Sequence, residues 1–249
     1  MAKIYVIGVD GLHNNGKTTQ LRLLNENLEK LGIFTIIRRG DGSRKGEGKD
    51  EFDAHSDWWL ENRPRIMAAG FEGRASQDAA TEASDRLNRE LALTKNWWMK
   101  KELQKNGLDK GVILQDRGLI SRLFVYRRYE STAGFKEVNF YTNRGRHEGV
   151  IVPDIIFLLH CPFDVLISRN LGRGDGSSKQ AFNETVLRNY FPDFEKHIAT
   201  LPDEIKDKTV ILDSSGTIEG IQQRLLENTL NLINEKSLSI EGGPSGAER

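Results

Sequence analysis

One short stretch of the chain, residues 11–18, carries the residue types needed to bind a phosphate group; it reads GLHNNGKT and is called the cradle below. It matches the Walker A pattern G-x-x-x-x-G-K-[ST] at every fixed position. Glycines near its two ends let the backbone wrap an anion, so that N–H groups and the start of a following helix face the phosphate oxygens. The lysine supplies positive charge to a transferred phosphoryl group, and the threonine hydroxyl is a ligand for Mg²⁺. The predicted nucleotide-binding residues are Gly11, His13, Asn14, Asn15, Gly16, Lys17, Thr18 and Thr19.

A carboxylate that could take part in phosphate binding follows another apolar run. Residues 112–115 read VILQ and are followed by Asp116. In phosphoryl-transfer proteins with such a cradle, an aspartate at the end of a strand helps to hold the metal ion that bridges the phosphates. We therefore predict that Thr18 and Asp116 bind Mg²⁺ and that ATP and Mg²⁺ are the cofactors. Taken alone, the aspartate fits equally well as the first residue of a turn.

Two arginines, Arg169 and Arg173, lie at the start of a glycine-rich stretch, residues 172–178. Guanidinium groups on a closing loop neutralise the charge that develops on a transferred phosphoryl group and exclude water. We therefore predict a lid near residues 170–180 and place both arginines among the catalytic candidates. The alternative is a solvated pair one helical turn apart.

Short apolar runs alternate with helical patterns, which is typical of βαβ units and a parallel sheet. The predicted strands are rich in Ile, Val and Leu, as suits strands covered by helices on both faces, and span residues 3–9, 34–38, 111–115, 154–160 and 209–212. The predicted helices span residues 17–31, 76–106, 163–170, 179–200 and 218–234. The cradle thus lies between a strand and a helix. The expected fold class is α/β, with a parallel sheet between two layers of helices.

Glycine and proline set the expected ends of these elements. Gly32 is the expected C-terminal cap of the first helix. Pro192 is expected to kink or break the helix over residues 179–200 near Tyr190. We expect one domain over residues 1–236, with loop insertions near 40–56 and 130–149, and a disordered tail over residues 237–249.

The composition limits the classes of partner. The 249 residues carry 36 basic and 36 acidic side chains, so no net charge draws the chain to DNA or to a membrane surface. The single cysteine, Cys161, excludes an internal disulfide and is interpreted as a small buried residue. No apolar run approaches about 20 residues and the first strand leaves no room for a signal peptide, so we expect a cytoplasmic protein with no membrane partner. The oligomeric state stays open, a homodimer included.

The order of these parts resembles the thymidylate kinase family of P-loop nucleoside monophosphate kinases. Residues 5–11 and 16–21, which read YVIGVDG and GKTTQL, are similar to that family's first strand, cradle and first helix. Asp116-Arg117 with Ser121 resembles its Asp-Arg-x-x-x-Ser element. Residues 153–159, followed by Arg169, resemble its fourth strand and the helix that leads to its lid. The likeness covers roughly residues 3–38 and 84–235.

This resemblance implies a five-stranded parallel sheet of order 2-3-1-4-5, with ATP and Mg²⁺ as cosubstrates and a mobile lid. By analogy with the family, Arg117 would bind the phosphate of the acceptor. Arg169 and Arg173 would clamp the phosphates of ATP during the transfer.

The chain departs from the family in the half of the site that would hold the acceptor. The third position of the family's cradle usually carries Asp, whereas this chain has His13, and Asn14 and Asn15 replace small residues. After the second strand, residues 38–42 read RRGDG where the family has Arg-Glu-Pro-Gly-Gly. Residues 124–126 read FVY where the family has Ala-Tyr-Gln. We therefore expect a nucleotide-like acceptor other than plain dTMP.

Candidates for the acceptor site lie at the ends of predicted strands, where open α/β sheets bind their ligands. Asp41 is a candidate base if the acceptor is an alcohol, and a turn-forming residue otherwise. His13 either contacts the acceptor or only caps the cradle. The acceptor-binding candidates are His13, Arg39, Asp41 and Arg117, and the catalytic candidates are Lys17, Asp41, Arg117, Arg169 and Arg173.

Three functions stay open on these residues. The leading one moves the γ-phosphoryl group of ATP to a small nucleotide-like acceptor. The second keeps the ATP site but phosphorylates a hydroxyl of a nucleoside, or of a modified base or end in a polynucleotide. In that case the arginines and aromatic residues of residues 122–146 would contact nucleic acid, although a solvated loop is the plainer interpretation. The third is a non-catalytic nucleotide-binding module.

Overall fold

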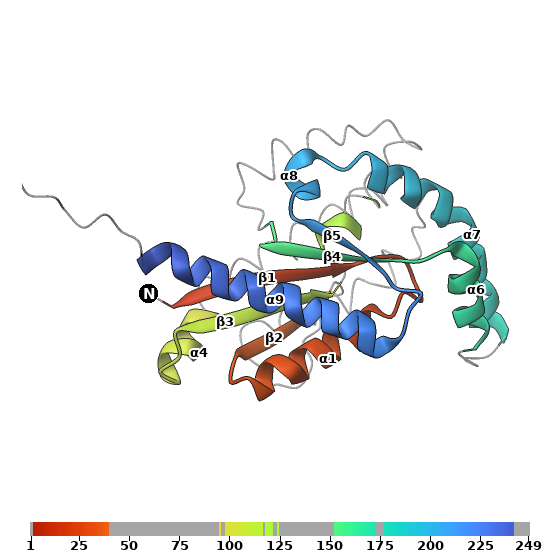
Figure 1. Cartoon of the computed structure of the whole chain (residues 1–249). Coiled ribbons are helices and arrows are strands. Elements are labelled where there is room, and N and C mark those ends of the chain that lie inside the picture. The colour runs from red at the N-terminus through yellow and green to blue at the C-terminus, as the bar shows by residue number, and fades with distance from the viewer. Residues whose placement is uncertain are drawn as a thin grey trace, which may run out of the picture.

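The structure is a computed structural model of the chain (Figure 1). It describes residues 2–39, 95, 98–116, 118–121, 124, 152–172 and 177–241. The loop insertions expected near 40–56 and 130–149 lie outside the described residues, as does most of the helix expected over 76–106.

The described strands form one sheet in which every neighbouring pair is parallel, in the order β2-β3-β1-β4-β5. Their bounds are β1 (Lys3–Asp10), β2 (Phe34–Arg39), β3 (Lys110–Asp116), β4 (Ile155–His160) and β5 (Thr209–Asp213). Each end lies within one residue of the predicted one, so the predicted strands and the sheet order are confirmed.

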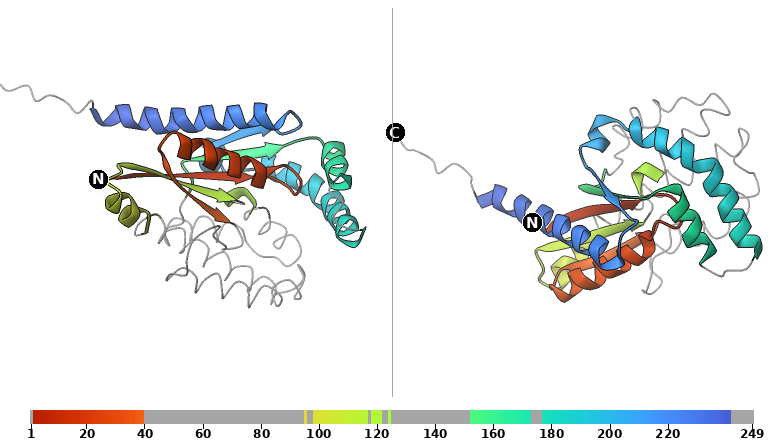
Figure 2. Two further views of the ribbon diagram at one scale, coloured as in Figure 1. Left: turned by 90° about the horizontal axis from the view of Figure 1, so that it is seen from below. Right: turned by 45° about the vertical axis from the view of Figure 1, so that its right-hand side comes forward.

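Both faces of the sheet are covered, which explains why the strands read as continuous apolar runs. Ile7 faces the side covered by α1 (Lys17–Lys30) and α9 (Ile218–Glu241). Val6, the residue before it, faces the opposite side, which α4 (Met99–Lys105) covers. The left-hand view of Figure 2 shows α1 and α9 on one side of the sheet and α4 on the other.

The layer opposite α1 and α9 continues beside β4. It contains α6 (Phe163–Leu171), α7 (Ser177–Ala199) and α8 (Asp203–Lys206). Leu158 of β4 packs there in the same apolar cluster as Leu187 of α7. The sheet therefore lies between two layers of helices, as expected for the α/β fold of P-loop proteins. Among the described residues, no helix is long and apolar enough to cross a membrane.

The ends of α1 follow from its sequence. Leu21, Leu24 and Leu28 recur on one face of the helix and are buried. After the helix, Gly32 adopts a φ of 73° and donates its N–H to the carbonyl oxygen of Glu29 at 2.9 Å. Glycine reaches such an angle without steric cost, so the predicted cap at Gly32 is confirmed.

Two helices differ from the expectation drawn from the sequence. α7 continues through Pro192 without a break. Its residues on both sides of the proline, Leu187 and Phe194, are buried in one apolar cluster, and this packing outweighs the roughly 3 kcal/mol that an interior proline costs. α9 continues to Glu241, so residues 237–241 of the expected disordered tail are helical. The reason is that no glycine or proline follows Gly220 until Gly242.

The carboxyl ends of the central strands lie at one edge of the sheet. β1 lies between β3 and β4, with Val9 in register with Asp116 and Asp10 in register with Leu158. Because the chain leaves β1 for β2 on one side and later forms β4 on the other, this is the point where the strand order reverses. Open α/β sheets bind their ligands at such a point.

Candidate phosphate-binding site

The cradle follows β1 directly and turns sharply into α1. Gly11, Asn14 and Gly16 have positive φ angles of 135°, 67° and 79°. A Cβ atom at Gly11 would lie 2.4 Å from the carbonyl oxygen of Leu159, so both backbone conformation and space require glycine there. α1 begins at Lys17, immediately after Gly16. The predicted order of strand, cradle and helix is present, and the positive end of the helix lies at the turn.

Lys17 lies within the turn rather than in solvent. The residue is only 6% exposed. Its Nζ donates a hydrogen bond to the carbonyl oxygen of Leu12 at 2.6 Å. A held ammonium group next to the N-terminus of a helix gives the cradle two sources of positive potential, and both favour an anion.

Thr18 and Asp116 bring two oxygen ligands together beside the cradle. Thr18 Oγ1 donates to Asp116 Oδ2 at 3.3 Å. The second carboxylate oxygen, Asp116 Oδ1, is buried and accepts no hydrogen bond from any residue that the structure describes. A buried anionic oxygen with no donor suits a hard cation, and Mg²⁺ is bound through one or two carboxylates while phosphate and water complete its shell. The two side chains therefore fit the predicted metal.

The described residues around the cradle do not form a closed metal site. In the described ranges, no group of three or more His, Cys, Asp or Glu side chains could hold a metal ion. That finding argues against a closed site built by the protein alone, such as structural zinc needs. An ion held partly by a ligand's phosphates remains consistent with the geometry.

Asn15 joins the cradle to the ends of β4 and β5. Its amide nitrogen donates to the carbonyl oxygen of Leu159 at 2.8 Å. Its amide oxygen accepts from the thiol of Cys161 at 2.9 Å and from the hydroxyl of Ser214 at 3.3 Å. Burial raises the pKa of the Cys161 thiol, which keeps it protonated and able to donate. The predicted buried cysteine is thus confirmed, and its hydrogen bond helps to fix the cradle.

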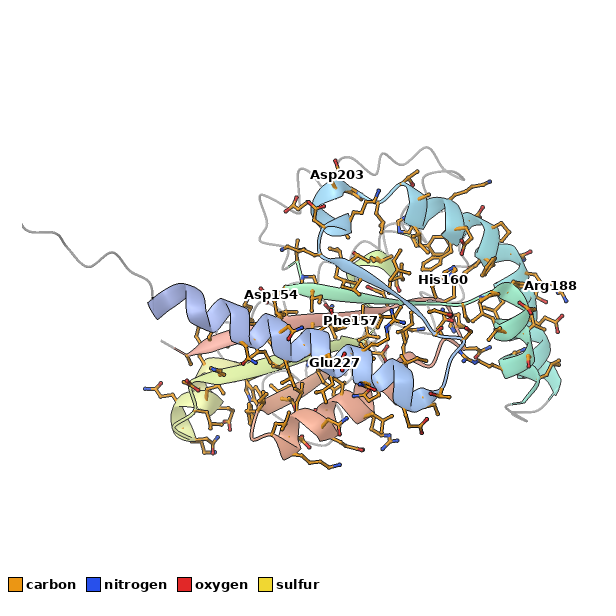
Figure 3. The ribbon with its side chains drawn as sticks, in the orientation of Figure 1. Asp154, Phe157, His160, Arg188, Asp203 and Glu227 are labelled. Carbon is orange, nitrogen blue, oxygen red and sulfur yellow. The ribbon has the colours of Figure 1, made fainter. Side chains whose placement is uncertain are left out.

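Ser214 also fixes the neighbouring arginine candidate. Its N–H and hydroxyl donate to the carbonyl oxygen of His160 at 2.7 and 3.1 Å. Figure 3 shows His160 at the carboxyl end of β4 and Asp154 at the other end. The carbonyl oxygen of Ser214 accepts a hydrogen bond from Arg169, in the last turn of α6, at 2.5 Å. Arg169 is therefore held at the same edge of the sheet as the cradle.

Asn14 forms a second link to α6. Its amide nitrogen donates to Asn170 Oδ1 at 3.3 Å, and both residues are buried. Asn14 Oδ1 is buried and has no hydrogen-bond donor within the part of the chain that the structure describes. The two asparagines that replace small residues of the family thus tie the cradle to three separate parts of the chain: β4, the segment after β5, and α6.

Asp10, the residue just before the cradle, is completely buried. Its Oδ2 accepts the backbone N–H of Ile120 at 3.2 Å. Its Oδ1 accepts the backbone N–H and the hydroxyl of Ser121 at 3.2 and 2.6 Å. Burial raises the pKa of the Asp10 carboxyl above its usual value, although these hydrogen bonds and the charge of Lys17 act in the opposite direction.

The other predicted site residues are placed as follows. His13 is partly buried within the cradle, and Thr19 is exposed in the first turn of α1. Arg39 ends β2 and lies in register with Asp116, which brings its backbone to the edge that carries the cradle. Asp41, Arg117 and Arg173 lie outside the described residues.

Four residues at this edge were not among the predicted site residues: Asp10, Asn170, Ser121 and Ser214. Asp10 carried one usable signal, since it is a charged residue at the end of an otherwise apolar strand. Ser121 was visible only as part of the family element. Nothing in the local sequence of Asn170 or Ser214 marks them, because their contacts join residues that are 156 and 199 positions apart.

Comparison with known proteins gives a likeness across nearly the whole chain. No protein-family model matches the sequence. The chain is 22% identical to a thymidylate kinase of Exiguobacterium sp. (strain ATCC BAA-1283 / AT1b) over 236 residues, which cover 92% of this chain and 95% of that protein. The likeness therefore concerns nearly the full length of the two proteins and not the cradle alone. Over most of its length, this chain resembles a thymidylate kinase.

Proposed function

We propose that the protein is an ATP-dependent phosphotransferase that moves the γ-phosphoryl group of ATP to a nucleotide-like acceptor. The observation that carries the proposal is the geometry of the cradle. A strand, a turn with three positive φ angles, a held lysine and a helix N-terminus follow one another at the carboxyl edge of a parallel sheet. The full-length likeness to a thymidylate kinase supports the same chemistry.

The cradle would bind the phosphates of ATP. Backbone amides of residues 11–18 and the N-terminus of α1 would donate to the phosphate oxygens. Lys17 would move its ammonium group from the carbonyl oxygen of Leu12 to the transferred phosphoryl group. Thr18 and Asp116 would hold Mg²⁺, which when bound neutralises charge on the phosphates and aligns them for transfer.

Arg169 would support the transfer from the other side. It lies in the last turn of α6, and its hydrogen bond to Ser214 keeps its guanidinium group at the ligand-binding edge. A guanidinium group there neutralises negative charge that develops on the transferred phosphoryl group. We extend this role to Arg173 from sequence alone.

The acceptor would bind beside β1 and β2. Arg39 and His13 are at this edge, and Asp41 and Arg117 lie two residues and one residue after the ends of β2 and β3 in the sequence. We propose that Arg117 binds an acceptor phosphate, as the resemblance implies. Since His13 and residues 38–42 differ from the thymidylate kinase pattern, we propose that the acceptor is not plain dTMP.

The test is ADP release measured with a panel of nucleoside monophosphates, nucleosides and oligonucleotides. Lys17→Ala is the blank, and Lys30→Ala, an exposed lysine in the last turn of the same helix, is the matched control. We expect a monophosphate to stimulate ADP release by the wild type. Loss of the Lys17 charge should lower this rate about 10²- to 10³-fold, and Lys30→Ala should leave it unchanged.

Two results would contradict the proposal. If no acceptor stimulates ADP release, the protein is better described as a nucleotide-binding module. If only nucleosides or oligonucleotide ends are phosphorylated, the acceptor group is a hydroxyl. Asp41→Asn should then lower the rate about 10²- to 10⁴-fold, because a hydroxyl needs a base to accept its proton.

A further inference from the structure

Asp10 is a buried carboxylate that has no role in the proposed transfer. An apolar side chain at this position would avoid the free-energy cost of burying a charge. The residues before it in β1, from Tyr5 to Val9, belong to the core of the sheet. A buried carboxylate loses its hydration, and hydrogen bonds must offset this loss. Since burial raises the pKa of Asp10, its hydrogen bonds and Lys17 offset the loss only in part. Titratable groups whose pKa is shifted by burial and by a nearby charge are concentrated at functional sites.

The hydrogen bonds of Asp10 hold the chain that leaves β3. Val9 is in register with Asp116 in the sheet. Asp10 then accepts both backbone amides of residues 120–121, which are helical. Between these two points lies Gly118, where a Cβ atom would lie 3.1 Å from Asp10 Oδ2. The chain at residues 118–121 therefore passes close to the Asp10 carboxylate and is bound to it.

These contacts place Asp116 under two constraints. On one side its carboxylate accepts the hydroxyl of Thr18. On the other, the segment that Asp10 holds begins only two positions later in the sequence, at Gly118. If that segment moved, the direction of the Asp116 side chain would change, and its donor-free oxygen would no longer lie where the structure places it.

We propose that Asp10 is a positioning residue that orients Asp116 toward Thr18 and thereby sets the affinity of this pair for Mg²⁺. The inference rests on the proposed function, since it takes Thr18 and Asp116 as the metal ligands. Side chains that hold a metal ligand in place commonly change metal affinity or activity about 10- to 100-fold when they are removed.

The experiment measures binding of a non-hydrolysable ATP analogue by calorimetry, once in EDTA and once over a series of Mg²⁺ concentrations. It needs no acceptor and no turnover. The main variant is Asp10→Asn, which keeps the size of the side chain but turns an NH₂ group toward backbone N–H donors. Ser121→Ala is a milder variant that removes only the hydroxyl donor at 2.6 Å.

Asp154→Asn is the matched control. Asp154 Oδ2 also accepts a backbone N–H, that of Val6 at 2.9 Å, but it lies at the opposite end of β4 from the cradle (Figure 3). A purely structural loss at Asp10 should resemble this control, with a lower unfolding temperature and an unchanged Mg²⁺ midpoint.

The expected result is a Mg²⁺ midpoint about 10-fold higher for Asp10→Asn and a smaller rise for Ser121→Ala, with affinity in EDTA unchanged within about twofold. If Asp10→Asn does not fold, the shift in Ser121→Ala decides the matter. Midpoints of the folded variants equal to that of the wild type would overturn the inference while leaving the proposed function intact. If Mg²⁺ has no effect on binding of the analogue by the wild type, Thr18 and Asp116 are not metal ligands and the inference is wrong as well. If the wild type does not bind the analogue at all, the proposed function is wrong, and so is the inference that rests on it.

Discussion

The cradle is held on its two sides by anchors of opposite chemistry. At its start, Asp10 accepts three hydrogen bonds with a fully buried carboxylate. Asn15 lies three residues before the end of the cradle. Its neutral amide donates a hydrogen bond to Leu159 and accepts hydrogen bonds from Cys161 and Ser214. Both anchors reach across the sheet, one to the segment after β3 and the other to the ends of β4 and β5.

Because of this difference, the two anchors should affect different properties of the protein. A neutral amide with its donor and acceptor both satisfied carries no charge into the interior and stays the same at every pH. A buried carboxylate costs stability when it is ionised, and its charge acts on Lys17 nearby. We therefore expect Asn15 to contribute mainly to the stability of the folded cradle, and Asp10 to contribute mainly to its chemistry.

The largest effect should come from Gly11→Ala, whose added Cβ would collide with the neutral anchor and would sit on a strained backbone. The added Cβ would meet the carbonyl oxygen of Leu159 at 2.4 Å and Asn15 Nδ2 at 3.1 Å, at a φ of 135°. Strain and overpacking together should lower the free energy of unfolding by about 3 kcal/mol or more and abolish nucleotide binding. Denaturant unfolding and calorimetry check this. Gly216→Ala, which has nothing within 4 Å of its new Cβ, should behave as the wild type.

A smaller effect is expected for Asn15→Ala, which breaks the neutral anchor alone. The carbonyl oxygen of Leu159 and the thiol of Cys161 would lose this partner, whereas the Ser214 hydroxyl would keep the carbonyl oxygen of His160. We expect the free energy of unfolding to fall by about 2 kcal/mol, while the Mg²⁺ midpoint of nucleotide binding stays that of the wild type. If Asn15→Ala instead shifted the Mg²⁺ midpoint and left the free energy of unfolding unchanged, the roles assigned to the two anchors would be reversed.

An exposed asparagine serves as the control for that loss. Asn106 donates its amide to the carbonyl oxygen of Glu102 at 2.8 Å at the end of α4, in contact with solvent. Because water replaces such a partner, Asn106→Ala should lower the free energy of unfolding by less than about 1 kcal/mol.

The smallest effect is the pH dependence of the charged anchor. The folded state raises the pKa of Asp10 above 3.8, so the folded state binds its proton more tightly than the unfolded state does. The contribution of this group to stability is therefore present at low pH and is lost as the pH rises from 3.8 through the folded-state pKa. Across that window, the stability of Asp10→Asn relative to the wild type should rise with pH. Unfolding measured at several pH values tests this sign, and a relative stability that falls with pH would refute it.

The fold was predictable from the sequence because its signals are local. Apolar runs such as residues 3–9 mark buried strands, and Gly32 ends α1 where the pattern placed it. The cradle was predictable for the same reason, since its spacing lies within eight consecutive positions. The continuation of α7 through Pro192 was not, because it depends on packing against distant side chains.

The two anchors could not be predicted from local sequence. The contacts of Asp10 join residues 110 and 111 positions apart, and those of Asn15 reach up to 199 positions along the chain. Only the sheet order brings these groups together. Asp116 Oδ1 illustrates the same limit: the sequence predicted its role, but its burial without a donor is a property of the folded site.

The most direct test of the central claim follows the backbone amides of residues 11–18 by nuclear magnetic resonance as Mg²⁺ and a non-hydrolysable ATP analogue are added. If these amides donate to the terminal phosphates, their resonances will shift together and saturate at one ligand concentration, and Lys17→Ala will require at least about tenfold more ligand. Cradle resonances that stay in place while others in the protein shift would show that the nucleotide binds elsewhere and would contradict the account.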